Sequence, residues 1–89
     1  MVIGVLKISM ELHGVFSLKE KRHIVKSLLE RIRSRFNVSA AETDLNEKWG
    51  NAVIGIACVT NESAHADSIM ANIVNFIETD GRVFISNYV

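Results

Sequence analysis

Hydrophobic and polar side chains alternate from Leu6 to Leu12, which is the pattern of a β-strand with one buried face. The apolar positions are Leu6, Ile8, Met10 and Leu12, and the polar positions are Lys7, Ser9 and Glu11. We expect this strand to begin near Val2. Because side chains alternate between the two faces of a strand, Ile3 and Val5 are predicted to point away from the face that the apolar set buries.

The spacing of apolar residues then changes to that of a helix. Ser17 stands three residues before Glu20, which is the pattern of a capping box at a helix start. Apolar residues recur on one arc of the following helix at Ile24, Val25, Leu28, Leu29, Ile32 and Phe36. The sequence therefore predicts an amphipathic helix from about Ser17 to Phe36, and Asn37 begins the exit from it.

The remainder of the chain predicts three more strands and one more helix. Residues 38–43 form a weaker strand pattern that runs into a polar turn at 44–47. Residues 52–60 are apolar on both faces, which is typical of a central strand covered on both sides. Asn61 is a suitable N-cap for a second amphipathic helix from about Glu62 to Thr79, and residues 83–89 supply the last strand.

This order of strands and helices predicts the fold class. The succession β-α-β-β-α-β, with right-handed crossovers, indicates an α+β protein with a ferredoxin-like split βαβ sandwich. In that fold a four-stranded antiparallel sheet carries two helices on one face, with the first and third strands in the centre. The other face would then expose Ile3 and Val5, and apolar faces of this kind usually meet a partner. We therefore expect a homodimer, formed through the open sheet face or an edge strand.

Length and composition indicate one soluble domain spanning residues 1–89. The chain has 89 residues, of which 48% are hydrophobic and 22% charged, so it can bury a core and is not expected to be disordered. Cys58 is the only cysteine, which excludes an internal disulfide. The sequence contains neither a signal-peptide pattern nor an apolar run of the ~20 residues that a membrane span needs. We expect a cytoplasmic protein without a membrane partner.

Charge is strongly segregated, although the formal net charge is zero. Residues 17–36 carry seven basic and two acidic side chains, whereas the remainder carries three basic and eight acidic ones. At 100° per residue, one stripe beside the apolar arc of the first helix collects Lys19, Arg22, Lys26 and Arg33. Such a row of cations is suited to following a phosphate backbone, although an ordinary solvated helix face has the same pattern. The candidate binding residues are Lys19, Lys21, Arg22, Lys26 and Arg33.

The sequence predicts no catalytic residue, metal site or cofactor, and therefore a protein that is not an enzyme. Cys58 lies in the middle of a predicted strand without a basic neighbour, so we interpret it as a core thiol. The three histidines lack the spacing of metal ligands, and no glycine-rich phosphate-binding sequence occurs. RNA-recognition motifs stack bases on aromatic residues of the central strands, and those strands contain none here. Trp49, beside Lys48, is the candidate for a stacking or partner contact, and a buried position over the sheet edge is at least as good an interpretation of it.

Several short motifs together resemble the YlxP-like family. They are Glu11-Leu12-His13, Ser17-Leu18-Lys19-Glu20-Lys21-Arg22, Arg35-Phe36-Asn37-Val38-Ser39, Ala41-Glu42 and Trp49. The resemblance spans nearly the whole chain, and the run from Ser17 to Arg22 is its most specific part. It implies a small bacterial protein with a ferredoxin-like fold and unknown function. Some members of that family lie among translation genes and carry a ribosome-binding label.

Two function hypotheses follow. The first is a non-enzymatic module that binds RNA or the ribosome through the basic helix, with ribosomal RNA or a ribosomal subunit as the partner. The alternative is a homodimeric module that binds a protein or a small ligand through its apolar sheet face. The two hypotheses do not exclude each other, because they use different surfaces.

Overall fold

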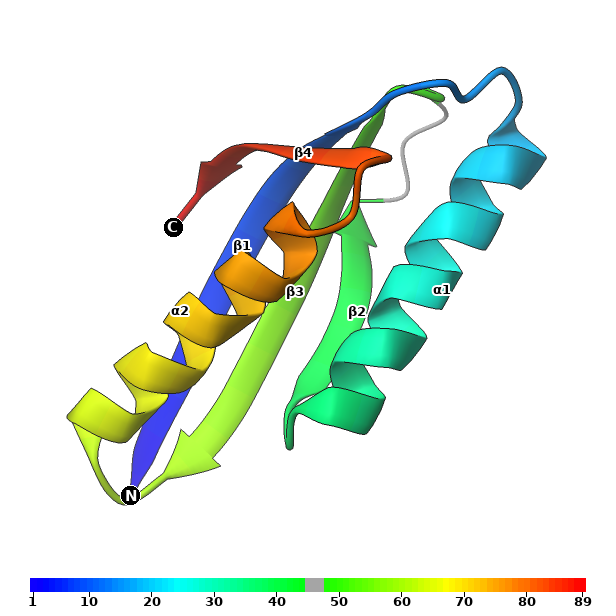
Figure 1. The fold of residues 1–89 in the computed structure, drawn as a ribbon. Coiled ribbons are helices and arrows are strands. Elements are labelled where there is room, and N and C mark those ends of the chain that lie inside the picture. Colours follow the sequence, from blue (N-terminus) through cyan, green and yellow to red (C-terminus); the bar gives the residue numbers. More distant parts are fainter. Residues whose placement is uncertain (45–47) are drawn as a thin grey trace.

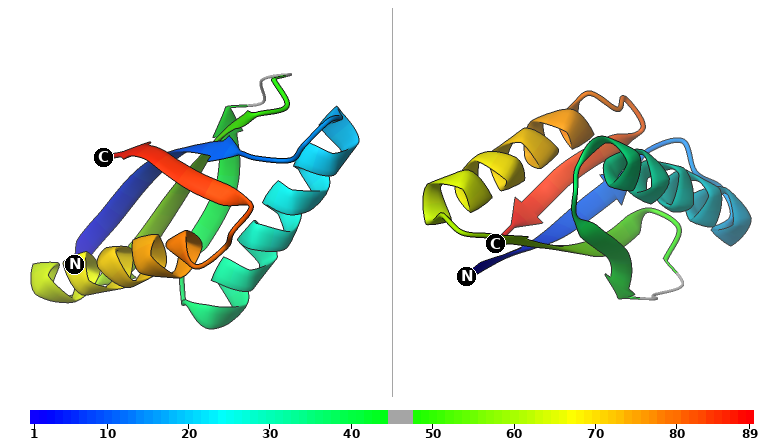
Figure 2. Two further views of the ribbon diagram at one scale, coloured as in Figure 1. Left: turned by 45° about the horizontal axis from the view of Figure 1, so that its top comes forward. Right: turned by 90° about the horizontal axis from the view of Figure 1, so that it is seen from below.

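The computed structural model describes residues 1–44 and 48–89. They form one four-stranded sheet and two helices (Figure 1). In chain order these elements are β1 (Val2–Leu12), α1 (Leu18–Arg35), β2 (Ser39–Asp44), β3 (Asn51–Thr60), α2 (Ser63–Glu78) and β4 (Val83–Tyr88). The sheet order is β2-β3-β1-β4, and every neighbouring pair is antiparallel. Both helices lie on one face (Figure 2). The ferredoxin-like α+β fold and the central position of β1 and β3 are confirmed.

The helix predictions are confirmed with small differences at the N-termini. Ser17 caps α1 by accepting a hydrogen bond from the Glu20 N–H at 3.1 Å. The Glu20 carboxylate accepts from the Phe16 N–H at 2.9 Å, one residue further back than a standard capping box requires. The predicted cap at Asn61 is wrong, because the first bond of α2 runs from the Ala66 N–H to the Glu62 carbonyl. The turn predicted over 44–47 lies, apart from its first residue, outside the described residues.

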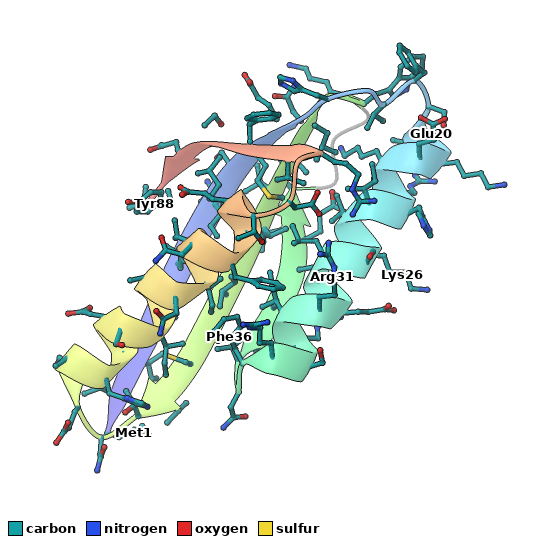
Figure 3. The ribbon with its side chains drawn as sticks, in the orientation of Figure 1. Met1, Glu20, Lys26, Arg31, Phe36 and Tyr88 are labelled. Atoms are coloured by element: carbon teal, nitrogen blue, oxygen red, sulfur yellow. The ribbon has the colours of Figure 1, made fainter. Side chains whose placement is uncertain are left out.

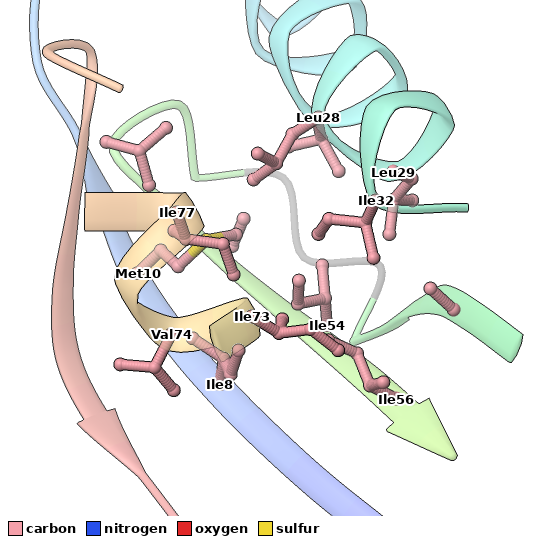
Figure 4. Close-up of a cluster of buried hydrophobic side chains, with 14 of the residues drawn as sticks. Ile8, Met10, Leu28, Leu29, Ile32, Ile54, Ile56, Ile73, Val74 and Ile77 are labelled. Atoms are coloured by element: carbon pink, nitrogen blue, oxygen red, sulfur yellow. The ribbon is translucent and has the colours of Figure 1, made fainter. Parts of the chain in front are cut away.

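The core lies between the helices and the inner face of the sheet (Figure 4). The alternating apolar positions of β1 are all buried, as predicted, with exposed fractions of 5% or less. They pack against one face of β3 and against apolar residues of both helices, among them Leu28, Ile32, Ile73 and Ile77. The expectation that β3 is covered on both faces is wrong. Its second face lies on the side without helices, where Val59 is 68% exposed.

The outer face of the sheet is open at the N-terminal half of β1. Ile3 and Val5 are 60% and 70% exposed there, so their predicted direction away from the helices is confirmed. On the inner face, Gly4 allows α2 to approach closely, because an added Cβ would lie 3.2 Å from the Ala66 Cβ and 3.0 Å from the Cys58 Sγ. The position therefore favours a residue without a side chain.

Candidate nucleic-acid interface on helix α1

Three of the predicted cations form a row on the exposed side of α1. We call Lys19, Arg22 and Lys26 the cationic face; all three side chains are exposed. Their spacing of three and four residues places them along about 10 Å of helix axis on one side. Among the described residues, none accepts a hydrogen bond or forms an ion pair with these three side chains. Lys26 extends away from the body of the protein (Figure 3).

Lys21 does not belong to this surface, which corrects its prediction as a binding residue. Its side chain is buried, with a residue exposure of 1%, and its Nζ lies 4.0 Å from a carboxylate oxygen of Glu42 on β2. Helical geometry explains why Lys21 is buried. Counted from Lys19, Lys21 lies at about 200°, near the centre of the apolar arc and opposite the row of cations.

Arg33 is also engaged within the fold. Its Nε donates to the Ala40 carbonyl at 3.0 Å, and its Nη2 donates to the same oxygen. The guanidinium thus attaches the last turns of α1 to the edge strand β2. Arg33 lies on the predicted stripe, but two of its N–H groups already bond to β2. The row of cations without a partner among the described residues is therefore shorter than the sequence predicts.

The other arginines near the end of α1 serve the fold as well. Arg31 Nη2 donates to Asp80 Oδ2 at 2.8 Å, and Arg82 donates to the same carboxylate through Nε at 3.2 Å and Nη2 at 3.0 Å. The hydrogen bond from Arg82, with the one from Arg31, holds the pKa of Asp80 well below its ordinary value. Arg35 lies over the Phe76 ring, 5.1 Å from its centre. The arginines in the second half of α1 therefore contact the rest of the fold. Among the described residues of α1, the cations without an internal partner are those of the cationic face, in its first half.

A hollow of about 420 Å³ opens beside the cationic face. It lies between α1 and the residue that precedes β4, and its lining residues are Lys19, Glu20, His23, Ile24 and Arg82. Arg82 lines the hollow and also donates to Asp80 through Nε and Nη2. His23 and Arg82 are neighbours of Lys19 that the sequence pattern did not predict. The four-residue spacing from Lys19 could have indicated His23, whereas no local pattern indicates Arg82.

The remaining candidates lie apart from this region. Trp49 is 50% exposed, between the undescribed residues and β3. Cys58 is buried at 3% exposure, as a core thiol. His13 lies against the Phe84 ring with 4.2 Å between ring centres. Within residues 1–44 and 48–89, no three His, Cys, Asp or Glu side chains are grouped as metal ligands, and neither helix is long and apolar enough to cross a bilayer.

Comparisons with known proteins bear on both the family and the fold. The chain is 30% identical over 78 residues to the "Uncharacterized protein YlxP" of Bacillus subtilis (strain 168), covering 88% of this chain and 85% of that protein. A de novo designed protein with a ferredoxin fold, solved by NMR, superposes with a TM-score of 0.61 at 15% identity, covering 100% of this chain and 84% of the design. The profile of the family described as "Protein of unknown function (DUF503)" matches residues 3–89. The resemblance to the YlxP-like proteins is thus confirmed, and the chain belongs to the DUF503 family.

Proposed function

We propose that this protein is a cytoplasmic, non-enzymatic module that binds the phosphate backbone of structured RNA through the cationic face of α1. Ribosomal RNA, free or in a ribosomal subunit, is the partner we favour. The observation that supports the proposal is the unpaired state of Lys19, Arg22 and Lys26 among the described residues. The other arginines of α1 make contacts within the protein, whereas these three cations lie in one exposed row.

The number of cations in the row gives the salt dependence that we expect of this binding. Three cations correspond to about three neutralised phosphates, so log affinity should fall with log salt at a slope of about −2.7 for a duplex-like target. A fourfold rise in salt would then weaken binding by about 40-fold. The row predicted from sequence alone had four cations and a steeper slope. We therefore expect the affinity for RNA to depend strongly on the salt concentration.

The hollow next to Lys19 can seat one phosphate group of the bound strand. Lys19 and His23 approach it from α1, and Arg82 approaches it from the segment before β4. Glu20 also lines the hollow, and its carboxylate, which accepts from the Phe16 N–H, reduces the net positive charge there. A phosphate in this position would receive donors from two separate parts of the fold, which favours a defined orientation over a sliding contact.

The competing interpretation is a solvated helix face without a ligand, and a matched pair of charge reversals separates the two. Lys26→Glu lies on the cationic face, and Lys7→Glu makes the same change at an exposed position of β1. Binding is measured by fluorescence anisotropy with a labelled ribosomal RNA hairpin over a series of salt concentrations. We expect Lys26→Glu to weaken binding and to reduce the salt slope by about one, while Lys7→Glu has a smaller effect.

Two results would contradict RNA binding by this helix. One is the absence of affinity for the hairpin and for ribosomal subunits even at low ionic strength. The other is an equal loss of affinity in Lys26→Glu and Lys7→Glu, because this would indicate a response to net charge alone. Circular dichroism of both variants controls for the fold.

A second candidate function is self-association through the outer face of the sheet. The exposed apolar side chains of Ile3, Val5 and Val59 favour it. Lys7 and Glu11 lie on the same face four residues apart, so two copies stacked in opposite directions could pair them. Sedimentation equilibrium tests this directly. A monomer at high micromolar concentration refutes the dimer, and a dimer that Val59→Lys dissolves supports it.

A further inference from the structure

The hollow beside the cationic face has walls of different chemical kinds. Its volume of about 420 Å³ falls within the range of about 300–1,000 Å³ that is typical of small-molecule sites, and one phosphate group does not fill it. The walls are one cation, one carboxylate, two planar polar groups and one apolar side chain, namely Lys19, Glu20, His23 with Arg82, and Ile24. A site for phosphate alone needs neither the carboxylate nor the apolar wall.

The guanidinium of Arg82 is held in one orientation at this hollow. Its Nε and Nη2 donate to the two carboxylate oxygens of Asp80 at 3.2 and 3.0 Å, and Arg31 donates to the same carboxylate. The Arg82 side chain is nevertheless half exposed, and so is His23 on α1 accessible to solvent. Imidazole rings and guanidinium planes are both groups on which unpaired RNA bases stack. The hollow therefore offers two surfaces to a flat aromatic ring, one from α1 and one from the segment before β4.

Glu20 supplies a hydrogen-bond acceptor in the first turn of α1 (Figure 3). Its Oε2 accepts from the Phe16 N–H, but an ionised carboxylate has two oxygens with about four lone-pair positions, so it can accept further bonds. Guanine has two neighbouring donors on its Watson–Crick edge, the N1–H and the N2 amino group, and this pair matches a carboxylate. Adenine, cytosine and uracil lack such a pair. The carboxylate thus favours guanine among the four bases.

The cationic face leads into the hollow, because Lys19 belongs to both. We propose that the hollow receives one unpaired guanine of the RNA strand whose phosphates lie along that face. The phosphate of this nucleotide would contact Lys19, its base would stack with His23 and Arg82 over Ile24, and its Watson–Crick edge would donate to Glu20. A paired guanine cannot bind in this way, since its complement occupies the same edge. The proposal rests on RNA binding by the cationic face and specifies the nucleotide that is bound.

Three labelled RNA hairpins with a one-nucleotide bulge test the proposal. They have the same number of phosphates, and the bulged position carries guanine, hypoxanthine or no base. Hypoxanthine lacks only the N2 amino group of guanine. In fluorescence anisotropy at constant salt, we expect the hypoxanthine hairpin to bind about tenfold more weakly than the guanine hairpin, as the loss of one hydrogen bond to a charged acceptor implies. The hairpin without the base should bind more weakly still, because stacking is lost as well.

The outcomes separate this proposal from the RNA binding on which it rests. Equal, salt-dependent affinity for all three hairpins would overturn the guanine site and leave phosphate binding by the cationic face intact. Equal affinity for guanine and hypoxanthine alone would overturn the role of the carboxylate. The absence of binding to any of the three at low ionic strength would instead overturn RNA binding by α1.

Glu20→Gln tests the carboxylate without removing the helix cap, because glutamine also serves in a capping box. The variant loses one negative charge, so we expect it to bind all three hairpins more tightly. The informative quantity is therefore the ratio of affinities for guanine and hypoxanthine, which should fall from about tenfold to within about twofold. An unchanged ratio would overturn the contact between Glu20 and the base.

His23→Ala tests stacking, and His65→Ala, at an exposed position of α2, is the matched control. We expect His23→Ala to weaken binding of the guanine hairpin by about fivefold or more and to leave the hairpin without the base unaffected. His65→Ala should change neither affinity. Equal losses for both hairpins in His23→Ala would overturn the stacking role. Competition by free guanosine monophosphate as strong as by the guanine hairpin would overturn the assignment to a strand, because the cationic face would then contribute nothing.

Discussion

The contact among Asp80, Arg31 and Arg82 provides the sharpest test of how α1 is held. The carboxylate of Asp80 is 6% exposed, and the two arginine side chains are 43% and 46% exposed. It also accepts from the Arg82 N–H at 2.9 Å, so the same side chain orders the segment that leads into β4. Asp80→Asn keeps the shape of the side chain and removes its charge.

The expected cost of Asp80→Asn lies between two limits. Hydrogen bonds to charged groups contribute about 1.5–3 kcal/mol when buried, whereas exposed ion pairs contribute less than about 1 kcal/mol. Because the carboxylate is buried and both guanidinium groups are half exposed, we expect a loss of about 2 kcal/mol in the free energy of unfolding. For a domain of this size, that loss lowers the melting temperature by about 8–16 °C.

The loss of stability in Asp80→Asn should become smaller at low pH. The pKa of Asp80 is lower in the folded protein than in the unfolded chain. Its stabilising contribution is therefore fully present above the unfolded pKa of about 3.9 and is lost as the pH falls below it. The difference in stability between wild type and Asp80→Asn should be largest near neutral pH and should narrow from about pH 4 downward.

Urea unfolding followed by circular dichroism at several pH values measures this difference. Asp67→Asn, at an exposed aspartate of α2, is the matched control and should change stability by no more than about 0.5 kcal/mol. A cost for Asp80→Asn as small as that of the control would refute the reasoning. A difference that stays constant down to about pH 2.5 would refute it as well.

Three further substitutions test other features of the fold. Gly4→Ala should cost about 1–3 kcal/mol in urea unfolding, because the added Cβ meets Ala66 at 3.2 Å; Gly81→Ala, with open space around it, should be nearly neutral. Ser17→Ala should cost about 1 kcal/mol by removing the cap of α1, and an unchanged urea midpoint would contradict that role. Lys21→Met should leave affinity for the RNA hairpin within about twofold, whereas Lys26→Met should lower it; equal losses in anisotropy titrations would return Lys21 to the binding surface.

The strands and helices were predicted well wherever apolar residues recur at a regular spacing along the chain. Strict alternation from Leu6 to Leu12 specified both the strand and its buried face, since a shift by one residue would expose the apolar set. The apolar positions from Ile24 to Ile32 specified the buried face of α1 in the same way, and the cap at Ser17 specified its start. The cap of α2 was misplaced because Asn61 and Glu62 are adjacent and no side chain in α2's first turn decides between them.

The candidate site was less predictable, because the partners of its charges are distant in sequence. Arg31 and Asp80 are 49 positions apart, and nothing local indicates that they meet. The bond from Arg33 to Ala40 depends on how β2 leaves the end of α1. Lys21 was the avoidable error, since its position within the apolar arc could be calculated from helical geometry.

Lysine and arginine react differently, so a reagent for amines can modify the cationic face of α1 without modifying the arginines of its second half. Amine acylation neutralises lysine and leaves guanidinium groups intact, so it would discharge Lys19 and Lys26 without touching the contacts of Arg31, Arg33 and Arg35. Burial protects Lys21 from the same reagent. Acylation of the native protein would thus remove two of the three charges of the cationic face while the arginine attachments of the helix persist. If the cationic face binds phosphate as proposed, acylation of these two lysines should weaken that binding, with Arg22 still charged, and should leave the arginine contacts of the fold in place.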